Sequence, residues 1–229
     1  MALVLLASTA AYAQEASSAH HCFQNASYWA RVFEQPERAK WQKPDEVVQA
    51  LGLKPGETVI DIGAGTGYFT RRFARAVAPN GRAIGVDIEP GMVAYMKADA
   101  KKLKVANYQA HLAQPDDPQV APREADVIFF CDVLHHVDNR VAYLRKLTSA
   151  LKPDGRIAVV DFQKTAPLGP PTAEKISQDE MIAEFKRAGY RLVGKHTFLP
   201  YQYFLEFAPE SPSAQNKNGR GATEHGPSD

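Results

Sequence analysis

Three glycines at alternating positions mark the stretch of the chain best suited to hold a ligand. Gly63, Gly65 and Gly67 lie between a largely apolar segment, 59–62, and a segment at 68–77 whose apolar residues recur at helical spacing. A strand, a glycine turn and a helix in that order present unpaired N–H groups and a partial positive charge beside a turn without side chains. We therefore expect a ligand to lie directly against this backbone.

The spacing of the glycines excludes two common phosphate-binding motifs. The dinucleotide fingerprint Gly-x-Gly-x-x-Gly would need its third glycine at Tyr68 or at Thr70, depending on where it starts. The phosphate loop needs a Lys-Ser or Lys-Thr pair after the glycines, and none follows here. Asp61, at the end of the apolar segment, suits a cationic group on the ligand better than a pyrophosphate.

A second carboxylate, Asp87, ends a strand predicted at 82–86. An acid about 20 residues beyond such glycines accepts hydrogen bonds from the hydroxyl groups of a ribose. Asp87 therefore favours a ligand that contains a nucleoside, without choosing between the cofactors that contain one. The alternative interpretation is that Asp87 caps the helix predicted at 90–103.

Polar residues also follow a strand predicted at 126–130. Asp132 comes first, and two adjacent histidines, His135 and His136, come soon after it. Open α/β sheets bind ligands at the carboxyl ends of their parallel strands, so we expect these side chains at that edge. A histidine with a pKa near 6.5 can accept a proton from a reacting group, which makes His135 and His136 the candidate catalytic residues. The alternative is that one histidine caps a helix turn and the other only packs.

Two stretches resemble motifs of the class I S-adenosylmethionine-dependent methyltransferases. Residues 57–70 resemble the first motif of that family, and Gly85-Val86-Asp87-Ile88-Glu89-Pro90 resembles the second. The resemblance extends over about 45–207 and implies S-adenosylmethionine as the cofactor. The cofactor-binding residues that it implies are Asp61, Gly63, Ala64, Gly65 and Gly67 around the amino-acid part, Asp87 on the ribose, Ile88 against the adenine, and Asp116 and Asp132. Asp116 replaces an acid that the family usually has earlier, where this chain has His111-Leu112-Ala113.

The fold that the resemblance implies is α/β. It is a Rossmann-like, doubly wound sheet of seven strands, with the last strand antiparallel and helices on both faces. The expected methyltransferase domain spans 53–208. A helical lid segment at 14–52 precedes it, and a tail at 209–229 without apolar periodicity is expected to be disordered.

Local signals predict where the later elements begin and end. Asp138 is the expected N-cap of a helix, and residues 152–155 are the expected turn into a strand at 156–161. Ser177 is the expected N-cap of the last helix, at 177–188.

The composition limits which classes of partner are expected. At 229 residues the chain is long enough for one domain with a sizeable core. Its 27 Lys and Arg residues balance 26 Asp and Glu residues, so we expect neither nucleic acid nor an anionic membrane as a partner. The two cysteines, Cys22 and Cys131, lack the spacing of metal ligands, and we expect inert thiols and no metal.

The first 13 residues have the character of a secretory signal. They are mostly apolar or small, too short to span a bilayer, and end in Ala11-Tyr12-Ala13 before Gln14, which suits a signal peptidase. No Lys or Arg precedes the apolar run, which a true start further upstream would explain. We expect a periplasmic or secreted protein; the alternative is a cytoplasmic protein with an N-terminal helix.

The function implied by the resemblance is methyl transfer from S-adenosylmethionine to a small-molecule acceptor by in-line displacement. Two alternatives stay open. One is a protein of this fold that holds the cofactor, or nothing, without catalysis. The other is a nicotinamide-dependent oxidoreductase, which would use Asp87 but leaves Asp61 and Tyr68 unexplained. The oligomeric state is left open.

Overall fold

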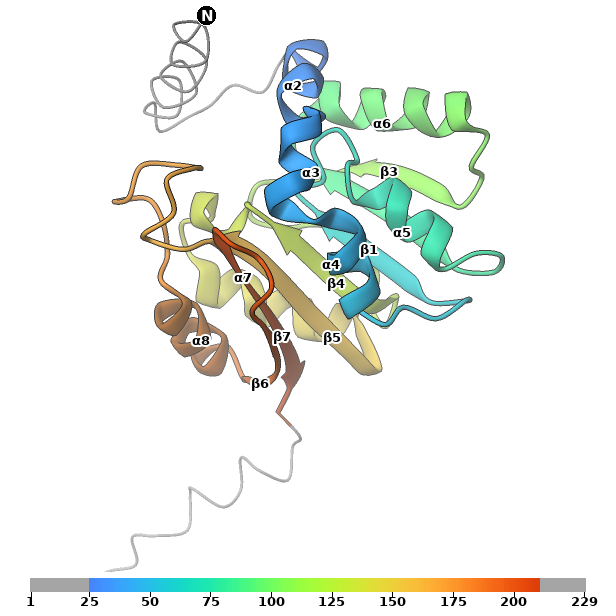
Figure 1. Ribbon diagram of the computed structural model, residues 1–229. Coiled ribbons are helices and arrows are strands. Elements are labelled where there is room, and N and C mark those ends of the chain that lie inside the picture. The colour runs from blue at the N-terminus through green and yellow to red at the C-terminus, as the bar shows by residue number, and fades with distance from the viewer. Residues whose placement is uncertain (1–24, 211–229) are drawn as a thin grey trace, which may run out of the picture.

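Seven strands form a single mixed sheet in the computed structural model, which describes residues 25–210 (Figure 1). The strands are β1 (Thr58–Ile62), β2 (Arg82–Asp87), β3 (Tyr108–Leu112), β4 (Ala125–Cys131), β5 (Leu151–Phe162), β6 (Tyr190–His196) and β7 (Gln202–Pro209). Their order across the sheet is β3-β2-β1-β4-β5-β7-β6. The first five strands run parallel, and β7 is antiparallel to both of its neighbours. The predicted fold class is therefore confirmed.

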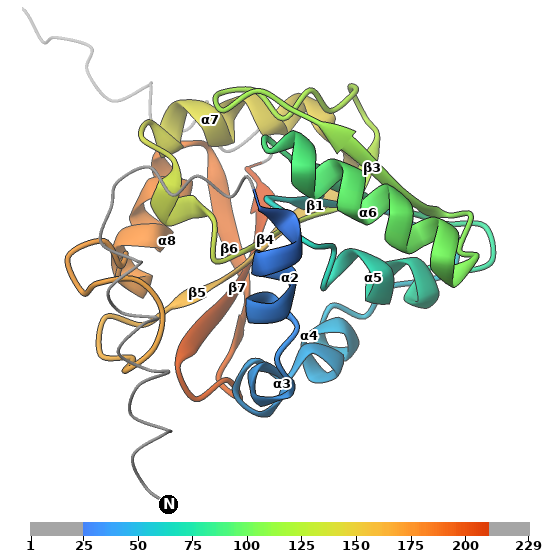
Figure 2. The ribbon, with the colours of Figure 1, turned by 90° about the horizontal axis from the view of Figure 1, so that it is seen from above.

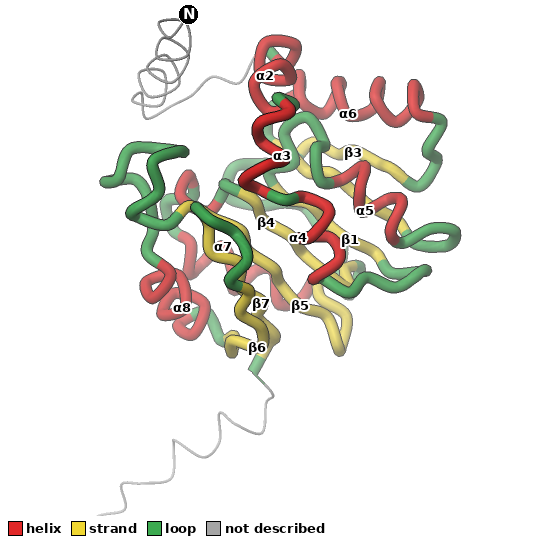
Figure 3. Tube along the Cα trace, viewed as in Figure 1, coloured by secondary structure: helices red, strands yellow, loops and turns green. Residues whose placement is uncertain are grey.

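Helices cover both faces of the sheet (Figure 3). They are α2 (Ala26–Phe33), α3 (Pro36–Gln42), α4 (Pro44–Ala50), α5 (Thr70–Ala76), α6 (Pro90–Leu103), α7 (Arg140–Leu147) and α8 (Gln178–Arg187). The core on one face includes side chains of α4, α5 and α6, and the core on the other includes those of α7 and α8. None of the helices within residues 25–210 is both long enough and apolar enough to cross a membrane.

The central strands are apolar almost throughout because helices bury them on both sides. In β4, the ring of Phe129 packs against that of Phe73 in α5, with centroids 4.9 Å apart. The next residue, Phe130, points into the core on the opposite face. On that face Phe185 of α8 stacks on Phe207 of β7, with centroids 3.8 Å apart. This packed layer is the rigid support for the loops at the strand ends.

The order of the strands places a ligand crevice between β1 and β4. These two strands pair in parallel, although β2 and β3 separate them in the sequence. The chain continues from β1 toward one edge of the sheet and from β4 toward the other. A crevice opens outside the carboxyl ends of strands at such a switch point. The predicted site residues follow β1, β2 and β4, and this edge is where they should meet.

The N-terminal helices α2 and α3 lie over this edge, and we call them the lid helices. Seen from above in Figure 2, α2 lies over the ends of the central strands. The predicted lid segment, 14–52, is helical over most of the part that the structure describes. The expected signal at 1–13, the first residues of the lid segment up to 24, and residues 211–229 of the expected tail lie outside the described residues.

Three local predictions need correction. Helix α7 is capped by Asn139, whose Oδ1 accepts a hydrogen bond from the Ala142 N–H at 3.3 Å, and not by Asp138. Residues 152–155 do not form a separate turn but belong to β5, where the pairing with β4 shifts register. The tail boundary at 209 falls inside β7, which ends at Pro209.

Candidate functional site

The loop between β1 and α5, residues 63–67, is the glycine loop, and two of its glycines cannot be replaced without a clash. Gly63 and Gly67 have φ angles of 69° and 76°, which side chains disfavour. A Cβ at Gly63 would lie 2.4 Å from a methyl carbon of Val133, and one at Gly67 would lie 1.8 Å from the Tyr108 hydroxyl oxygen. These two positions therefore need glycine, because neighbouring side chains already fill the space that a Cβ would take.

Asp61 lies under this loop, at the end of β1. Its side chain is buried, and Oδ2 accepts a hydrogen bond from the Thr70 hydroxyl at 2.6 Å. Burial raises the pKa of Asp61 to about 7, although this hydrogen bond and the charge of Arg38 oppose the shift. The structure thus places a carboxylate that ionises near neutral pH directly behind the glycine loop.

Asp87 ties the glycine loop to the end of β2. Its Oδ2 accepts a hydrogen bond from the Gly65 N–H at 2.8 Å, and its Oδ1 accepts one from the Glu89 N–H at 3.0 Å. Burial raises the pKa of Asp87 above its ordinary value despite these hydrogen bonds. The N-cap of α6 is Glu89, without a side-chain hydrogen bond, so Asp87 does not cap that helix.

Two apolar side chains lie exposed beside Asp87. Ile88 follows Asp87 and is 50% exposed, and Leu112, the strand partner of Asp87 on β3, is 44% exposed. An exposed pair of this kind at the carboxyl edge can pack against a flat apolar ring. The packing of Ile88 against an adenine ring stays a prediction.

Asp116 is a predicted site residue that lies apart from this group. Its side chain is 85% exposed, and it lies 3.7 Å from the ammonium of Lys146, near the end of α7. The Lys146 ammonium also donates a hydrogen bond to the backbone carbonyl of Asp116 at 2.8 Å. Both contacts hold Asp116 toward α7 and away from Asp87.

Asp132 follows β4 with a φ of 58°, a backbone conformation that few residues other than glycine adopt. Its carboxylate accepts hydrogen bonds from the side-chain amides of Gln202, at 2.6 Å, and Gln42, at 3.1 Å. Burial, and then the charge of Asp161, raises the pKa of Asp132 to about 6. Sequence reasoning missed both glutamines, which come from β7 and from a lid helix. The one signal is that Gln202 is, with Glu206, one of two polar residues in a mostly apolar strand.

His135 and Asp161 form a buried pair at the ends of β4 and β5. The Nδ1 atom of His135 lies 3.0 Å from Oδ1 of Asp161, and the two side chains are 3% and 1% exposed. Because an ionised carboxylate only accepts hydrogen bonds, Nδ1 carries the proton and Nε2 of the neutral ring is the free acceptor. Burial lowers the pKa of His135, but the hydrogen bond and the charge of Asp161 outweigh it and raise the pKa. Sequence reasoning missed Asp161, although it is the last polar residue of a predicted strand.

The second histidine is placed differently. His136 is exposed, and its ring centroid lies 4.1 Å from that of His135. Both belong to a short 3-10 helix, Leu134–His136, so adjacent side chains point in different directions. The structure thus joins His135 to a carboxylate at the sheet edge and leaves the ring of His136 largely open to solvent.

The lid helices are fastened to the glycine loop by charged groups. Glu34 accepts a hydrogen bond from the Thr66 hydroxyl at 2.8 Å and pairs with both terminal nitrogens of Arg71 in α5. In α3, the Arg38 guanidinium lies 4.2 Å from the centre of the Tyr68 ring. These contacts close the lid helices over the crevice between β1 and β4.

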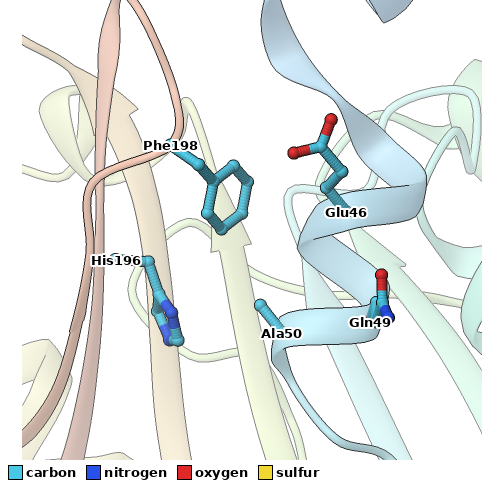
Figure 4. A pocket seen from close by; sticks show the side chains of 5 residues that line it. All are labelled: Glu46, Gln49, Ala50, His196 and Phe198. Atoms are coloured by element: carbon cyan, nitrogen blue, oxygen red, sulfur yellow. The ribbon is translucent and has the colours of Figure 1, made fainter.

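A surface pocket elsewhere contains none of the predicted site residues. Its volume is about 300 Å³, and Figure 4 shows side chains from α4 and from the end of β6 around it. It is lined by Glu46, Gln49, Ala50, His196 and Phe198. None of these residues belongs to the site described above, so the pocket is separate from it.

The described residues contain no group of three or more His, Cys, Asp or Glu side chains that could hold a metal ion. Cys131, the one cysteine among them, forms no disulfide, and burial raises the pKa of its thiol well above the ordinary value. Cys22 lies outside the described residues.

Comparison with known proteins places most of the chain in one family. Residues 53–203 match a family model described as a methyltransferase domain. The chain is 32% identical over 118 residues to a ubiquinone/menaquinone biosynthesis C-methyltransferase of Ectopseudomonas mendocina, over 51% of this chain and 46% of that protein. It is 30% identical over 115 residues to an arsenite methyltransferase of Halobacterium salinarum, over 50% of this chain and 29% of that protein. The match therefore spans less than half the length of these relatives.

Solved structures share the fold at lower identity. A SAM-dependent methyltransferase from Aquifex aeolicus superposes with a TM-score of 0.75 at 24% identity, over 80% of this chain and 97% of that one. The magnesium protoporphyrin IX methyltransferase of Synechocystis PCC 6803, with bound SAM, has a TM-score of 0.64 at 20% identity, over 86% of this chain and 97% of that one. At these identities the likeness concerns the fold.

Proposed function

The chain belongs to the class I S-adenosylmethionine-dependent methyltransferases, and from this membership we propose that it transfers a methyl group to a small-molecule acceptor. S-adenosylmethionine is therefore its cofactor. The observation that carries the proposal is the buried pair of His135 and Asp161. This pair lies at the carboxyl ends of the parallel strands, the same edge of the sheet from which the glycine loop leaves β1. This pair gives the crevice a proton acceptor, which a protein that only held the cofactor would not need.

The residues around the crevice fit the cofactor. The glycine loop has no side chain at residues 63, 65 and 67, which would let the amino-acid part lie close to the backbone. The carboxylate of Asp61 supplies negative charge behind the loop, where the cofactor's ammonium would lie. We expect Asp87 to accept hydrogen bonds from the ribose hydroxyl groups and the exposed pair of Ile88 and Leu112 to pack against the adenine ring.

Methyl transfer depends mainly on how the acceptor is positioned relative to the cofactor. When bound, the cofactor supplies a methyl group on a sulfonium that is a good leaving group. The protein must hold the acceptor in line with it, and such positioning contributes roughly 7–11 kcal/mol to lowering a barrier. Where the acceptor must lose a proton, Nε2 of His135 accepts it, and Asp161 stabilises the resulting imidazolium.

A polar group on the acceptor would also satisfy a buried hydroxyl. The Tyr203 hydroxyl is buried, has no hydrogen-bond partner among the described residues, and lies opposite Asp161 on β7. Burial, and then the charges of Asp161 and Asp132, raises its pKa, so it stays protonated and can donate. Because unpaired buried hydroxyls are costly, an acceptor oxygen or nitrogen is the natural partner. We therefore propose an acceptor with an ionisable hydroxyl or amine.

The named activities of the relatives bear on this proposal in different ways. The quinone-pathway relative is named for methylation of carbon, and a phenolic ring that is methylated at carbon first loses a hydroxyl proton. The arsenite relative is named for a soft metalloid, which prefers thiolate ligands. Cys131 is a single buried thiol with a raised pKa, so the described residues favour the first chemistry over the second.

The test is a methyl-transfer assay with isotope-labelled S-adenosylmethionine and a panel of hydroquinones, phenols and amines. We expect formation of S-adenosylhomocysteine that depends on an acceptor, and loss of turnover in Asp87→Ala through weaker cofactor binding. Methylation of only protein or RNA would overturn the small-molecule acceptor. Cofactor binding without turnover on any acceptor class would favour the non-catalytic alternative.

A further inference from the structure

Arg38 brings a positive charge from a lid helix to the end of the glycine loop. Its guanidinium lies 4.2 Å from the centre of the Tyr68 ring, and Tyr68 directly follows the last glycine of the glycine loop. Its charge also lowers the pKa of Asp61, at the end of β1, and of Asp132, after β4, against the larger effect of burial. Arg38 therefore lies near the ends of both strands that flank the switch point.

The guanidinium of Arg38 is only partly used by the protein. Its Nε donates a hydrogen bond to Oε1 of Gln42, and its Nη1 donates one to the carbonyl of Phe33 at 3.0 Å. Within residues 25–210 its Nη2 has no hydrogen-bond acceptor, and no carboxylate lies within ion-pair distance of the guanidinium. Partly buried charges are normally paired, so an anionic group is missing from this set.

We propose that Arg38 binds the α-carboxylate of S-adenosylmethionine, so that a lid helix supplies a ligand to the cofactor. The inference rests on the proposed function, which places the amino-acid part of the cofactor against the glycine loop. That part carries an ammonium and a carboxylate, and the crevice offers Asp61 for the first and Arg38 for the second. A planar guanidinium with free N–H groups matches a carboxylate better than an ammonium would.

The assignment also explains the two hydrogen bonds that Arg38 makes within the lid helices. The hydrogen bonds to Gln42 and Phe33 orient the guanidinium within the lid. Gln42 in turn donates to Asp132, which fixes this part of α3 to the end of β4. The cofactor's carboxylate would then join the lid to the glycine loop, and cofactor binding would favour the closed lid.

The experiment compares two ligands by calorimetric titration of the full chain. S-adenosylhomocysteine carries the carboxylate, and its decarboxylated analogue keeps the ammonium but lacks the carboxylate. In Arg38→Gln we expect S-adenosylhomocysteine to bind roughly 10- to 100-fold more weakly, the loss typical of a hydrogen-bonded charged group. The affinity for the analogue should not change, and Arg38→Lys should recover part of the lost affinity.

Arg72 offers a matched control. Its guanidinium lies 4.1 Å from the centre of the same Tyr68 ring, but it donates to the Tyr68 carbonyl and pairs with Asp45 on the surface. Arg72→Gln should leave both affinities unchanged. An equal loss for both ligands in Arg38→Gln would show that Arg38 only supports the lid and would overturn the proposal, as would an unchanged affinity for S-adenosylhomocysteine. No methyl acceptor enters these titrations, so their outcome is independent of the acceptor panel.

Discussion

The carboxylate of Asp61 is buried behind the glycine loop and accepts one side-chain hydrogen bond, from Thr70. Its pKa in the folded chain is about 7, against 3.8 for an ordinary aspartate. Because the folded pKa is raised, the associated stability is present below about pH 4 and is lost as the pH rises through about 7. Retaining the charge at this position costs up to about 4 kcal/mol at neutral pH.

Asp61→Asn should remove this dependence. The amide keeps an oxygen that accepts the Thr70 hydroxyl hydrogen, but it does not ionise. We expect urea unfolding to show a larger fall in stability between about pH 4.5 and about pH 8 for the wild type than for Asp61→Asn, by about 3 kcal/mol. Asp132 titrates in both proteins and cancels in the comparison. Equal falls in both would contradict the raised pKa of Asp61.

His135 should control the pH dependence of turnover. As a base it acts when neutral, so kcat/KM should rise with pH through its raised pKa and then level off. His135→Gln should lower kcat by about 10²–10⁴ on an acceptor that must lose a proton, with cofactor affinity unchanged. In Asp161→Asn the inflection should move to lower pH, because burial, which lowers the pKa, is then less opposed.

His136→Gln is the control for this prediction, since His136 is the exposed neighbour. Its pH profile should match that of the wild type. A loss of turnover confined to His136→Gln would transfer the role of base to the other histidine. A wild-type profile flat across the range would show that the acceptor needs no base.

Among the elements, the lid helices depend on a few charged contacts. Glu34 lies between α2 and α3 and pairs with Arg71, where the two side chains are 25% and 16% exposed. We expect Glu34→Gln to loosen the lid, so that backbone amides of α2 and α3 exchange with solvent roughly tenfold faster while those of β1 and β4 do not change. Hydrogen–deuterium exchange read by mass spectrometry measures both regions in one experiment.

Glu37→Gln gives the comparison on the same lid helices. Among residues 25–210 Glu37 pairs only with Lys40, and both side chains are more than two-thirds exposed, so its loss should matter little. If the two variants exchanged alike, the contact of Glu34 with the glycine loop would not be what closes the lid helices.

The elements that were predictable from the sequence are those with local signals. The glycine loop fixed the place of β1 and α5, and the N-cap at Ser177, whose hydroxyl accepts from the Glu180 N–H, fixed the start of α8. Local signals were ambiguous for α7, where Asp138 and Asn139 are both good caps and the structure uses the second. Adjacent capping residues leave such boundaries undecided until tertiary packing chooses.

The polar contacts of the candidate site were not predictable in the same way. Gln42 and Asp132 are 90 residues apart, and Gln42 and Gln202 are 160 apart. Neither glutamine has a spacing that distinguishes it from a surface residue. Only the closing of α3 onto the ends of β4 and β7 brings the three together. The role of Arg38 could not be predicted from the sequence for the same reason, because it depends on the contact with Tyr68, which only the folded chain forms.

At the scale of the whole molecule, the sheet and the cofactor edge follow from the motifs, but the place of the protein in the cell does not follow from the fold. We propose that residues 1–13 are removed during export and that the mature chain begins at Gln14. The support is in the sequence alone, in the apolar run and the small residues at Ala11 and Ala13.

Export would separate the protein from the source of its cofactor, because S-adenosylmethionine is made in the cytoplasm. After expression in a bacterial host, intact-mass measurement of the periplasmic fraction should find a chain beginning at Gln14. Ala13→Leu should block cleavage, since the peptidase requires a small residue there, whereas Ser8→Ala should be processed normally. The periplasmic chain should contain less bound S-adenosylmethionine or S-adenosylhomocysteine than a version that begins at Gln14 and is made in the cytoplasm, because export separates it from the supply. Recovery of uncleaved chain from the cytoplasm alone, with the cofactor bound, would contradict export and place methyl transfer where the cofactor is made.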